Sequence, residues 1–259
     1  MPNDSKIESI IKNSGHNLHF EVVKILKACG WEITISQFYL DPVTGKQREI
    51  DIVAIKSFKV AKNNELKVRL VIECKQINSE NVIWFDKKNI SKTIKLAKDN
   101  IILQNKEDMC LKNTSVIPNK IHHYIQDLDV AKLSAKNGKS ETDPLFDLMN
   151  GCFNALVYFK ENLPIGYYSI DYPLAILQSF ENLYKKDNSE KGYSQINQPF
   201  ELEVDYSYPI KSGNVVNKYF LLDIVSIYQL ESFLDNLEEN DISLLRGILN
   251  FDINVRKGG

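Results

Sequence analysis

REIDIVA (residues 48–54) and VIECK (residues 71–75) are two apolar runs that each carry acidic side chains. Both read as β-strands, and residues i and i+2 of a strand share one face, so Glu73 and Lys75 point the same way. Asp51 lies beside them if the two strands pair. Carboxylates and an ammonium group gathered in this way cost free energy unless something uses them. A divalent cation acting on a phosphate would use all of them.

The segments around these runs predict one helix followed by an antiparallel meander. Residues 66–74 alternate apolar side chains onto one face, which is typical of a strand. The turn residues of 41–46, with proline and glycine, predict a hairpin between two earlier strands. A helix that begins at Asn17 and stops at Gly30 carries Glu21 beside its apolar stripe. We therefore expect a helix over residues 17–29 and strands over 31–40, 48–56 and 66–74.

The rest of the chain predicts further strands and helices. The expected helices cover residues 86–106, 145–160 and 230–249, the expected strands cover 172–179, 200–209 and 217–228, and 115–125 stays unassigned. Residues 132–143 are polar and contain a glycine, so they predict a loop or linker. We predict an α/β fold with a mixed sheet, a central antiparallel meander and flanking helices. Residues 1–131 form the core, and 143–259 form a C-terminal α/β extension packed on it.

The order of Glu21 on a helix, Asp51 on a strand and Glu73-x-Lys75 on the next strand resembles the restriction-endonuclease-like superfamily, the PD-(D/E)xK phosphodiesterases. The resemblance covers residues 16–76, about a quarter of the chain. Ile50 stands where the motif has proline, a departure that is frequent in the superfamily. The resemblance implies a restriction-endonuclease-like core and a nuclease that cuts nucleic acid.

The resemblance also implies roles for the five residues of this motif. Asp51 and Glu73 would hold Mg²⁺ or Mn²⁺, since hard oxygen ligands select these ions over zinc, and the Cys74 backbone carbonyl would be a third ligand. Glu21 would bind a second metal or reach the first through water. Lys75 would orient or deprotonate the attacking water, or stabilise the phosphorane. We predict Glu21, Asp51, Glu73 and Lys75 as catalytic residues.

Composition places few limits on function. The chain has 259 residues, is 43% hydrophobic and has a net charge of −2, so any contact with nucleic acid must come from a local patch. Four separated cysteines, a polar start and the lack of a membrane-length apolar run predict a cytoplasmic protein with no membrane contact.

From the superfamily we expect DNA rather than RNA as substrate and endonuclease rather than exonuclease activity, with restriction, repair and anti-phage defence all open. The C-terminal half is open to substrate selection, dimerisation or binding of a regulatory protein.

Several alternatives stay open at this point. A lone Glu-x-Lys on a strand is usually a solvated pair, so the same fold is also compatible with a catalytically silent nucleic-acid-binding or regulatory module. A glycosidase with paired carboxylates would leave Lys75 unexplained. We expect His19 to be a cap or surface residue and the adjacent His122 and His123 to lie on the surface. A group of lysines reads equally as a phosphate-tracking helix or a solvated face: Lys87, Lys88, Lys92, Lys95 and Lys98.

Overall fold

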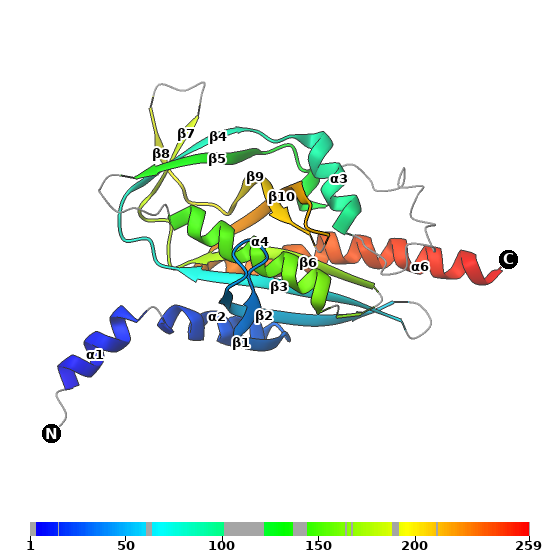
Figure 1. Cartoon of the computed structure of the whole chain (residues 1–259), viewed down its shortest axis with the longest axis horizontal. Coiled ribbons are helices and arrows are strands. Elements are labelled where there is room, and N and C mark those ends of the chain that lie inside the picture. The colour runs from blue at the N-terminus through cyan, green and yellow to red at the C-terminus, as the bar shows by residue number, and fades with distance from the viewer. Residues whose placement is uncertain are drawn as a thin grey trace.

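The computed structural model describes residues 4–14, 16–60, 64–100, 122–136, 144–163, 165–166, 168–187, 192–210 and 212–258. Its described strands form one sheet of ten, in the order β1-β2-β3-β6-β10-β9-β5-β4-β7-β8 (Figure 1). The strands are β1 (Glu32–Leu40), β2 (Gln47–Lys59), β3 (Glu65–Lys75), β4 (Asn81–Lys87), β5 (Asp129–Lys136), β6 (Tyr168–Leu177), β7 (Leu183–Asp187), β8 (Ser194–Gln195), β9 (Phe200–Pro209) and β10 (Val215–Ser226).

Helices cover both faces of this sheet. They are α1 (Asp4–Asn13), α2 (His16–Ala28), α3 (Ile90–Asn100), α4 (Pro144–Asn162), α5 (Leu230–Asn236) and α6 (Ser243–Gly258), with the short 3₁₀ turns η4 (His123–Ile125) and η5 (Ile227–Gln229) and the π-helical segment η6 (Leu237–Ile242). The predicted α/β class, with a mixed sheet between helices, is confirmed. No helix among the described residues is long and apolar enough to cross a membrane.

The antiparallel meander lies at one edge of the sheet, and its predicted central position is wrong. β1, β2 and β3 pair antiparallel, but β6 joins β3 on its other side as a parallel strand, and β10 joins β6 in the same direction. β9, β5, β4, β7 and β8 extend the sheet beyond β10. Strands from residues 143–259 therefore lie between β3 and β5, and the two predicted segments share one sheet.

Local signals explain the ends of the first elements. The Gly30 N–H donates to the Lys27 carbonyl and the Trp31 N–H to the Leu26 carbonyl, which ends α2 in a Schellman motif with Gly30 at φ +80°. In the β1–β2 turn, Oδ1 of Asp41 accepts hydrogen bonds from the backbone N–H groups of Val43 and Thr44. These are the turns that the sequence predicts.

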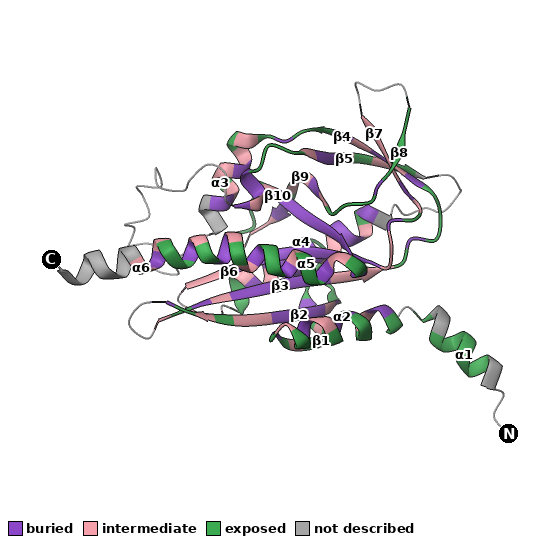
Figure 2. Cartoon of the chain, turned by 180° about the vertical axis from the view of Figure 1, so that it is seen from behind, coloured by how far each residue is buried: buried purple, intermediate pink, exposed green. Residues whose placement is uncertain are grey.

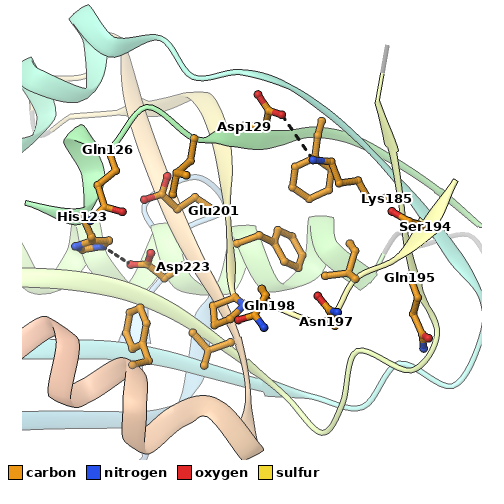
Figure 3. Close-up of a pocket in the computed structure, with 17 residues that line it drawn as sticks. His123, Gln126, Asp129, Lys185, Ser194, Gln195, Asn197, Gln198, Glu201 and Asp223 are labelled. Carbon is orange, nitrogen blue, oxygen red and sulfur yellow. Dashed lines mark hydrogen bonds and ion pairs between the residues drawn. The ribbon is translucent and has the colours of Figure 1, made fainter. Parts of the chain in front are cut away.

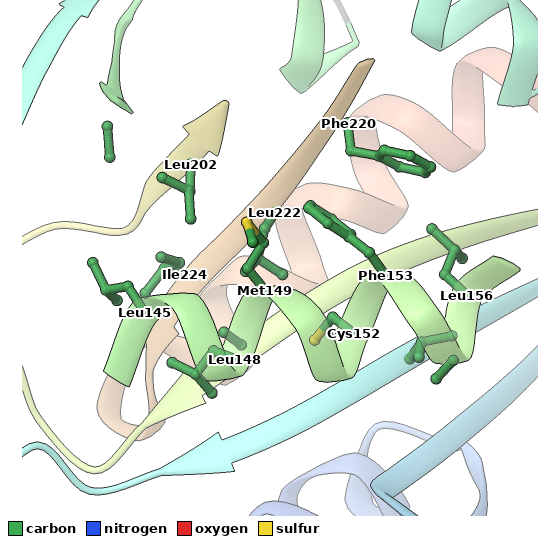
Figure 4. Packing of buried hydrophobic residues seen from close by; sticks show 14 of the residues in the cluster. Leu145, Leu148, Met149, Cys152, Phe153, Leu156, Leu202, Phe220, Leu222 and Ile224 are labelled. Atoms are coloured by element: carbon green, nitrogen blue, oxygen red, sulfur yellow. The ribbon is translucent and has the colours of Figure 1, made fainter. Parts of the chain in front are cut away.

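Two apolar cores lie on opposite faces of the sheet. One core packs α2, α5, η6 and α6 against one face of β2, β3, β6 and β10, and the other packs α4 against the opposite face (Figure 2). On the α4 face, Phe153 stacks on Phe220 of β10 with ring centroids 4.8 Å apart (Figure 4). α4 packs on β3 and β6 and brings Asp147 and Gly151 of its first two turns to the end of β3 where Glu73 and Lys75 lie.

Two predictions about the middle of the chain need correction, and part of each lies outside the described residues. Residues 81–87 form β4, which the sequence analysis did not predict, and the helix expected from residue 86 begins at Ile90. The predicted linker over 132–143 is wrong as far as residue 136, because β5 pairs antiparallel with β4 there. Residues 101–106 and 137–143 lie outside the described residues. Strand pairing between β4 and β5 joins segments some forty residues apart, which a local polar pattern cannot reveal.

Candidate active site

Asp51 and Glu73 lie at a fork where β2 and β3 part. The last paired positions of the two strands are Ile52 and Ile72, and Asp51 and Glu73 are the next residues beyond that pair. On the other side of β2, the register places Ser36 of β1 opposite Asp51, and Ser36 has a left-handed backbone with φ 55°. Strained backbone of this kind concentrates at functional sites. We call Asp51, Glu73 and Lys75 the fork site.

Two groups hold the Asp51 carboxylate in place. Its Oδ2 atom accepts a 2.7 Å hydrogen bond from the Cys74 backbone N–H. The same oxygen lies 3.5 Å from Nε2 of His19, on the helix that covers this end of the sheet. Donor atoms of His19, Asp51 and the Cys74 side chain all lie within 4.8 Å of one another. Asp51 is therefore bound on one side by the backbone of β3 and on the other by α2.

Glu73 is half-buried and lies against α4 at a position where only glycine fits. A Cβ atom on Gly151 would lie 2.2 Å from Oε1 of Glu73. The Tyr39 hydroxyl of β1 donates a 3.4 Å hydrogen bond to the Gly151 carbonyl and so ties this turn of α4 to the sheet. Glycine inside a helix costs about 1 kcal/mol relative to alanine, and here the space that it leaves holds a carboxylate.

Burial and the neighbouring Asp51 carboxylate raise the pKa of Glu73 to about 9, although the Lys75 ammonium opposes this shift. Burial, with Asp51 and Glu73 adding to it, also raises the pKa of the Cys74 thiol well above its ordinary value. Burial is the first cause of both shifts and the neighbouring carboxylates are the second, so ionised Asp51 and Glu73 are costly to hold side by side. An added cation is the group that would relieve this cost.

Lys75 shares its ammonium with an acid that the sequence analysis missed. Its Nζ lies 3.0 Å from Oδ2 of Asp147 in the first turn of α4, and the two side chains are 32% and 40% exposed. Asp147 and Gly151 are four residues apart, so they lie on the same face of the helix. α4 therefore supplies both the space for Glu73 and a partner for Lys75.

Glu21 is the one predicted catalytic residue that the structure does not join to the others. It is exposed on α2, and among the described residues no hydrogen bond or ion pair links it to Asp51, Glu73 or Lys75. His19, two residues earlier, makes the contact with Asp51 instead, although we expected it to be a cap or surface residue. The predicted metal-ligand role of the Cys74 carbonyl stays a prediction.

The donor set of the fork site fits a hard divalent cation. Asp51 and Glu73 place two carboxylates next to each other, and their oxygens are ligands that Mg²⁺ and Mn²⁺ prefer. The observation that favours a bound cation here is geometric: Asp51 and Glu73 are adjacent just beyond the last strand pair, and Gly151 leaves space for the Glu73 carboxylate. In comparisons with protein-family models, curated proteins and solved structures, nothing matches this chain.

Proposed function

We propose that this protein is a metal-dependent nuclease of the PD-(D/E)xK type, with a restriction-endonuclease-like core. One observation carries the proposal: Asp51 and Glu73 are adjacent where β2 and β3 part, and Lys75 follows on the same strand. The run α2-β1-β2-β3, followed after β4, α3, η4 and β5 by α4 and β6, supports it, because α4 lies over the fork site and β6 pairs parallel with β3. A nucleic-acid substrate, DNA rather than RNA, and endonuclease action follow from the resemblance alone, as do restriction and anti-phage roles.

In this proposal the metal ion is held by the carboxylates of Asp51 and Glu73. A bound Mg²⁺ or Mn²⁺ supplies charge neutralisation for the phosphate and lowers the pKa of a coordinated water. The Cys74 N–H and His19 fix the orientation of the Asp51 carboxylate, because each contacts its Oδ2 atom. Gly151 leaves the space that lets Glu73 approach Asp51.

Lys75 is placed to stabilise negative charge on the phosphate or to act on the attacking water. The Lys75 side chain is about one-third exposed, so a substrate can approach it from solvent, and Asp147 restrains it without burying it. A charge-stabilising donor acts most strongly where negative charge develops in the transition state. Lys75 either stabilises the phosphorane or orients and deprotonates the attacking water.

A second candidate function is a silent nucleic-acid-binding or regulatory module on the same fold. Two observations favour it: Glu21 has no described link to the fork site, and the Lys75 ammonium already has an acidic partner in Asp147. The two candidates differ in turnover, since only the nuclease breaks phosphodiester bonds.

The test is a cleavage assay on supercoiled plasmid, linear duplex DNA and RNA, each with Mg²⁺, Mn²⁺ or EDTA. Asp51→Asn keeps the shape of the side chain and removes its charge, so we expect cleavage to vanish while the circular dichroism spectrum stays unchanged. Asp86→Asn, at an exposed position of β4, is the matched control and should cleave like the parent. Cleavage by Asp51→Asn at the parental rate would show that the fork site is not the active site. Binding without cleavage under every metal would favour the silent module.

A further inference from the structure

A cavity of about 480 Å³ lies away from the fork site, between β9, β10 and the outer strands of the sheet (Figure 3). Its walls include the aromatic rings of Phe85, Phe200 and Phe233 and four side-chain amides. His123, Glu201 and Asp223 line one end of it, and Figure 3 shows them grouped there. Neither Asp51 nor Glu73 lines this cavity, so it is separate from the fork site.

Two acids face each other across neighbouring strands at this end of the cavity. Asp223 of β10 pairs in register with Glu201 of β9, and their residues are only 3% and 9% exposed. Like charges directly opposite each other in a sheet are destabilising, and burial increases that effect. Nε2 of His123 lies 3.2 Å from Oδ2 of Asp223, and one donor atom from each of the three side chains falls within 4.8 Å of the others. Two carboxylates and one imidazole therefore converge on a single point at the wall of a cavity.

A third acid, Asp241, fixes the orientation of the His123 ring. The Asp241 carboxylate contacts Nδ1 of His123 and accepts the His123 backbone N–H at 2.9 Å. The Tyr172 hydroxyl donates to Asp241 as well, at 3.2 Å. Asp241 is fully buried on η6, and π-helical segments of this kind occur frequently at functional sites. Nδ1 is held by the Asp241 carboxylate, and Nε2 is directed at Asp223. Metal-binding histidines commonly have this arrangement, in which a carboxylate contacts the ring nitrogen that does not bind the metal.

Lys88, His122 and His123 are the basic groups that lie against these three acids. The fully buried Lys88 pairs with Oε2 of Glu201. His123 contacts both Asp223 and Asp241, and Nε2 of His122 lies 3.3 Å from Oδ2 of Asp241. A network that served only to anchor η4 to the sheet would not need two opposed acids at the wall of an open cavity.

We propose that His123, Glu201 and Asp223 form a second metal site, which binds a divalent ion such as Zn²⁺, Co²⁺ or Mn²⁺. One imidazole nitrogen with two carboxylate oxygens suits these ions better than Mg²⁺ or Ca²⁺, which prefer oxygen ligands alone. The ion takes the place of the proton on Nε2 of His123, which leaves to solvent. Three protein ligands at a cavity wall leave coordination positions open to water or a small ligand, as in catalytic rather than structural zinc sites. This inference does not rest on the proposed nuclease activity.

The test is a Co²⁺ titration of the full chain, followed by the visible absorption of the bound ion. The background is the double variant Asp51→Asn and Cys74→Ala, which removes the Asp51 carboxylate and the Cys74 thiol, two of the donors near the fork site. We expect one Co²⁺ per chain, displaced by one equivalent of Zn²⁺ and not by millimolar Mg²⁺. Asp223→Asn keeps the side-chain shape and should weaken Co²⁺ binding by at least about tenfold. Asp205→Asn is the matched control on the neighbouring β9, where Asp205 pairs with Lys92 at the exposed surface, and should bind like its parent.

The outcomes separate clearly. Absence of Co²⁺ binding in the double variant, or equal binding after Asp223→Asn, would overturn the second metal site. If Asp223→Asn does not fold, the anomalous signal of zinc in crystals of the chain grown with Zn²⁺ decides the matter. Density between His123 and Asp223 supports the site, and zinc bound only elsewhere rejects it.

Discussion

Replacing Gly151 by alanine places a methyl group where the Glu73 carboxylate lies. The added Cβ would be 2.2 Å from Oε1, 2.7 Å from Cδ and 3.0 Å from Cγ of Glu73. Real Cβ atoms essentially never approach a heavy atom closer than 3.0 Å, so Oε1 must retreat by about 0.8 Å. The far end of a glutamate side chain is able to make this movement, and the movement takes it away from its place beside Asp51.

A displacement of this size is enough to impair catalysis without unfolding the protein. A misplacement of about 1 Å at a reacting centre costs on the order of a hundredfold in rate. Alanine favours the helix by about 1 kcal/mol over glycine, and the crowding of a packed site costs about 1–3 kcal/mol. We therefore expect Gly151→Ala to lower the single-turnover cleavage rate about a hundredfold and the free energy of unfolding by no more than about 2 kcal/mol.

Gly247→Ala is the matched control for this substitution. Gly247 is an exposed glycine inside α6, and a Cβ atom there would have nothing within 4 Å. Its replacement should raise the free energy of unfolding by about 0.5–1 kcal/mol and leave cleavage unchanged. The rate is measured with saturating protein on a labelled duplex, unfolding by urea titration, and Mn²⁺ affinity by calorimetry. A Gly151→Ala protein that binds Mn²⁺ and cleaves like the parent would refute the assignment of Glu73 as a ligand.

Three further changes test the fork site. Lys75→Ala should keep nucleic-acid affinity within about threefold and lower the single-turnover rate at least about a hundredfold. Lys95→Ala, at an exposed position, should change neither quantity. Lost affinity with an unchanged rate would make Lys75 a docking residue. Because the pKa of Glu73 is raised to about 9, the folded metal-free protein keeps a proton that the unfolded chain releases, so stability falls as pH rises from about 4.5 toward 9. Glu73→Gln should therefore raise the free energy of unfolding in EDTA at pH 8 by at least about 1.4 kcal/mol, equivalent to one pKa unit, and an unchanged urea midpoint would contradict this. His19→Ala should weaken Mn²⁺ affinity or slow cleavage about tenfold, more than Glu21→Ala does, because His19 contacts Asp51. A larger effect of Glu21→Ala would support the predicted catalytic role of Glu21.

The sequence was sufficient for the parts of the fold that local patterns determine. Alternating apolar residues predicted β2 and β3 to within a few residues, and Gly30 and the turn after β1 marked the ends of their elements. The i, i+2 rule placed Glu73 and Lys75 on one face of β3, and pairing with β2 then brings Asp51 alongside. These inferences need only a strand of known direction and its immediate neighbour.

The sequence was insufficient for contacts between distant segments. Asp147 and Gly151 meet β3 because β6 pairs parallel with it, and no local pattern states which strand lies beside β3. A glycine inside the apolar α4 was the one available signal, since glycine there lowers helix stability. The expected surface position of His122 and His123 was wrong for the same reason: His122 is 1% exposed and His123 lies between Asp223 and Asp241, which follow about a hundred residues later.

The fork site and the proposed second metal site share one construction. In each, an acid on one strand lies beside an acid on the next, and one histidine and one lysine lie next to the acids.

The two sites differ in how their lysines meet solvent. Lys75 is 32% exposed, whereas the side chain of Lys88 is completely buried. A polymer with a phosphate backbone can reach the first ammonium and cannot reach the second. In the proposed function, chemistry on a nucleic acid therefore takes place at the fork site, and the cavity admits only an ion and a ligand small enough to enter about 480 Å³.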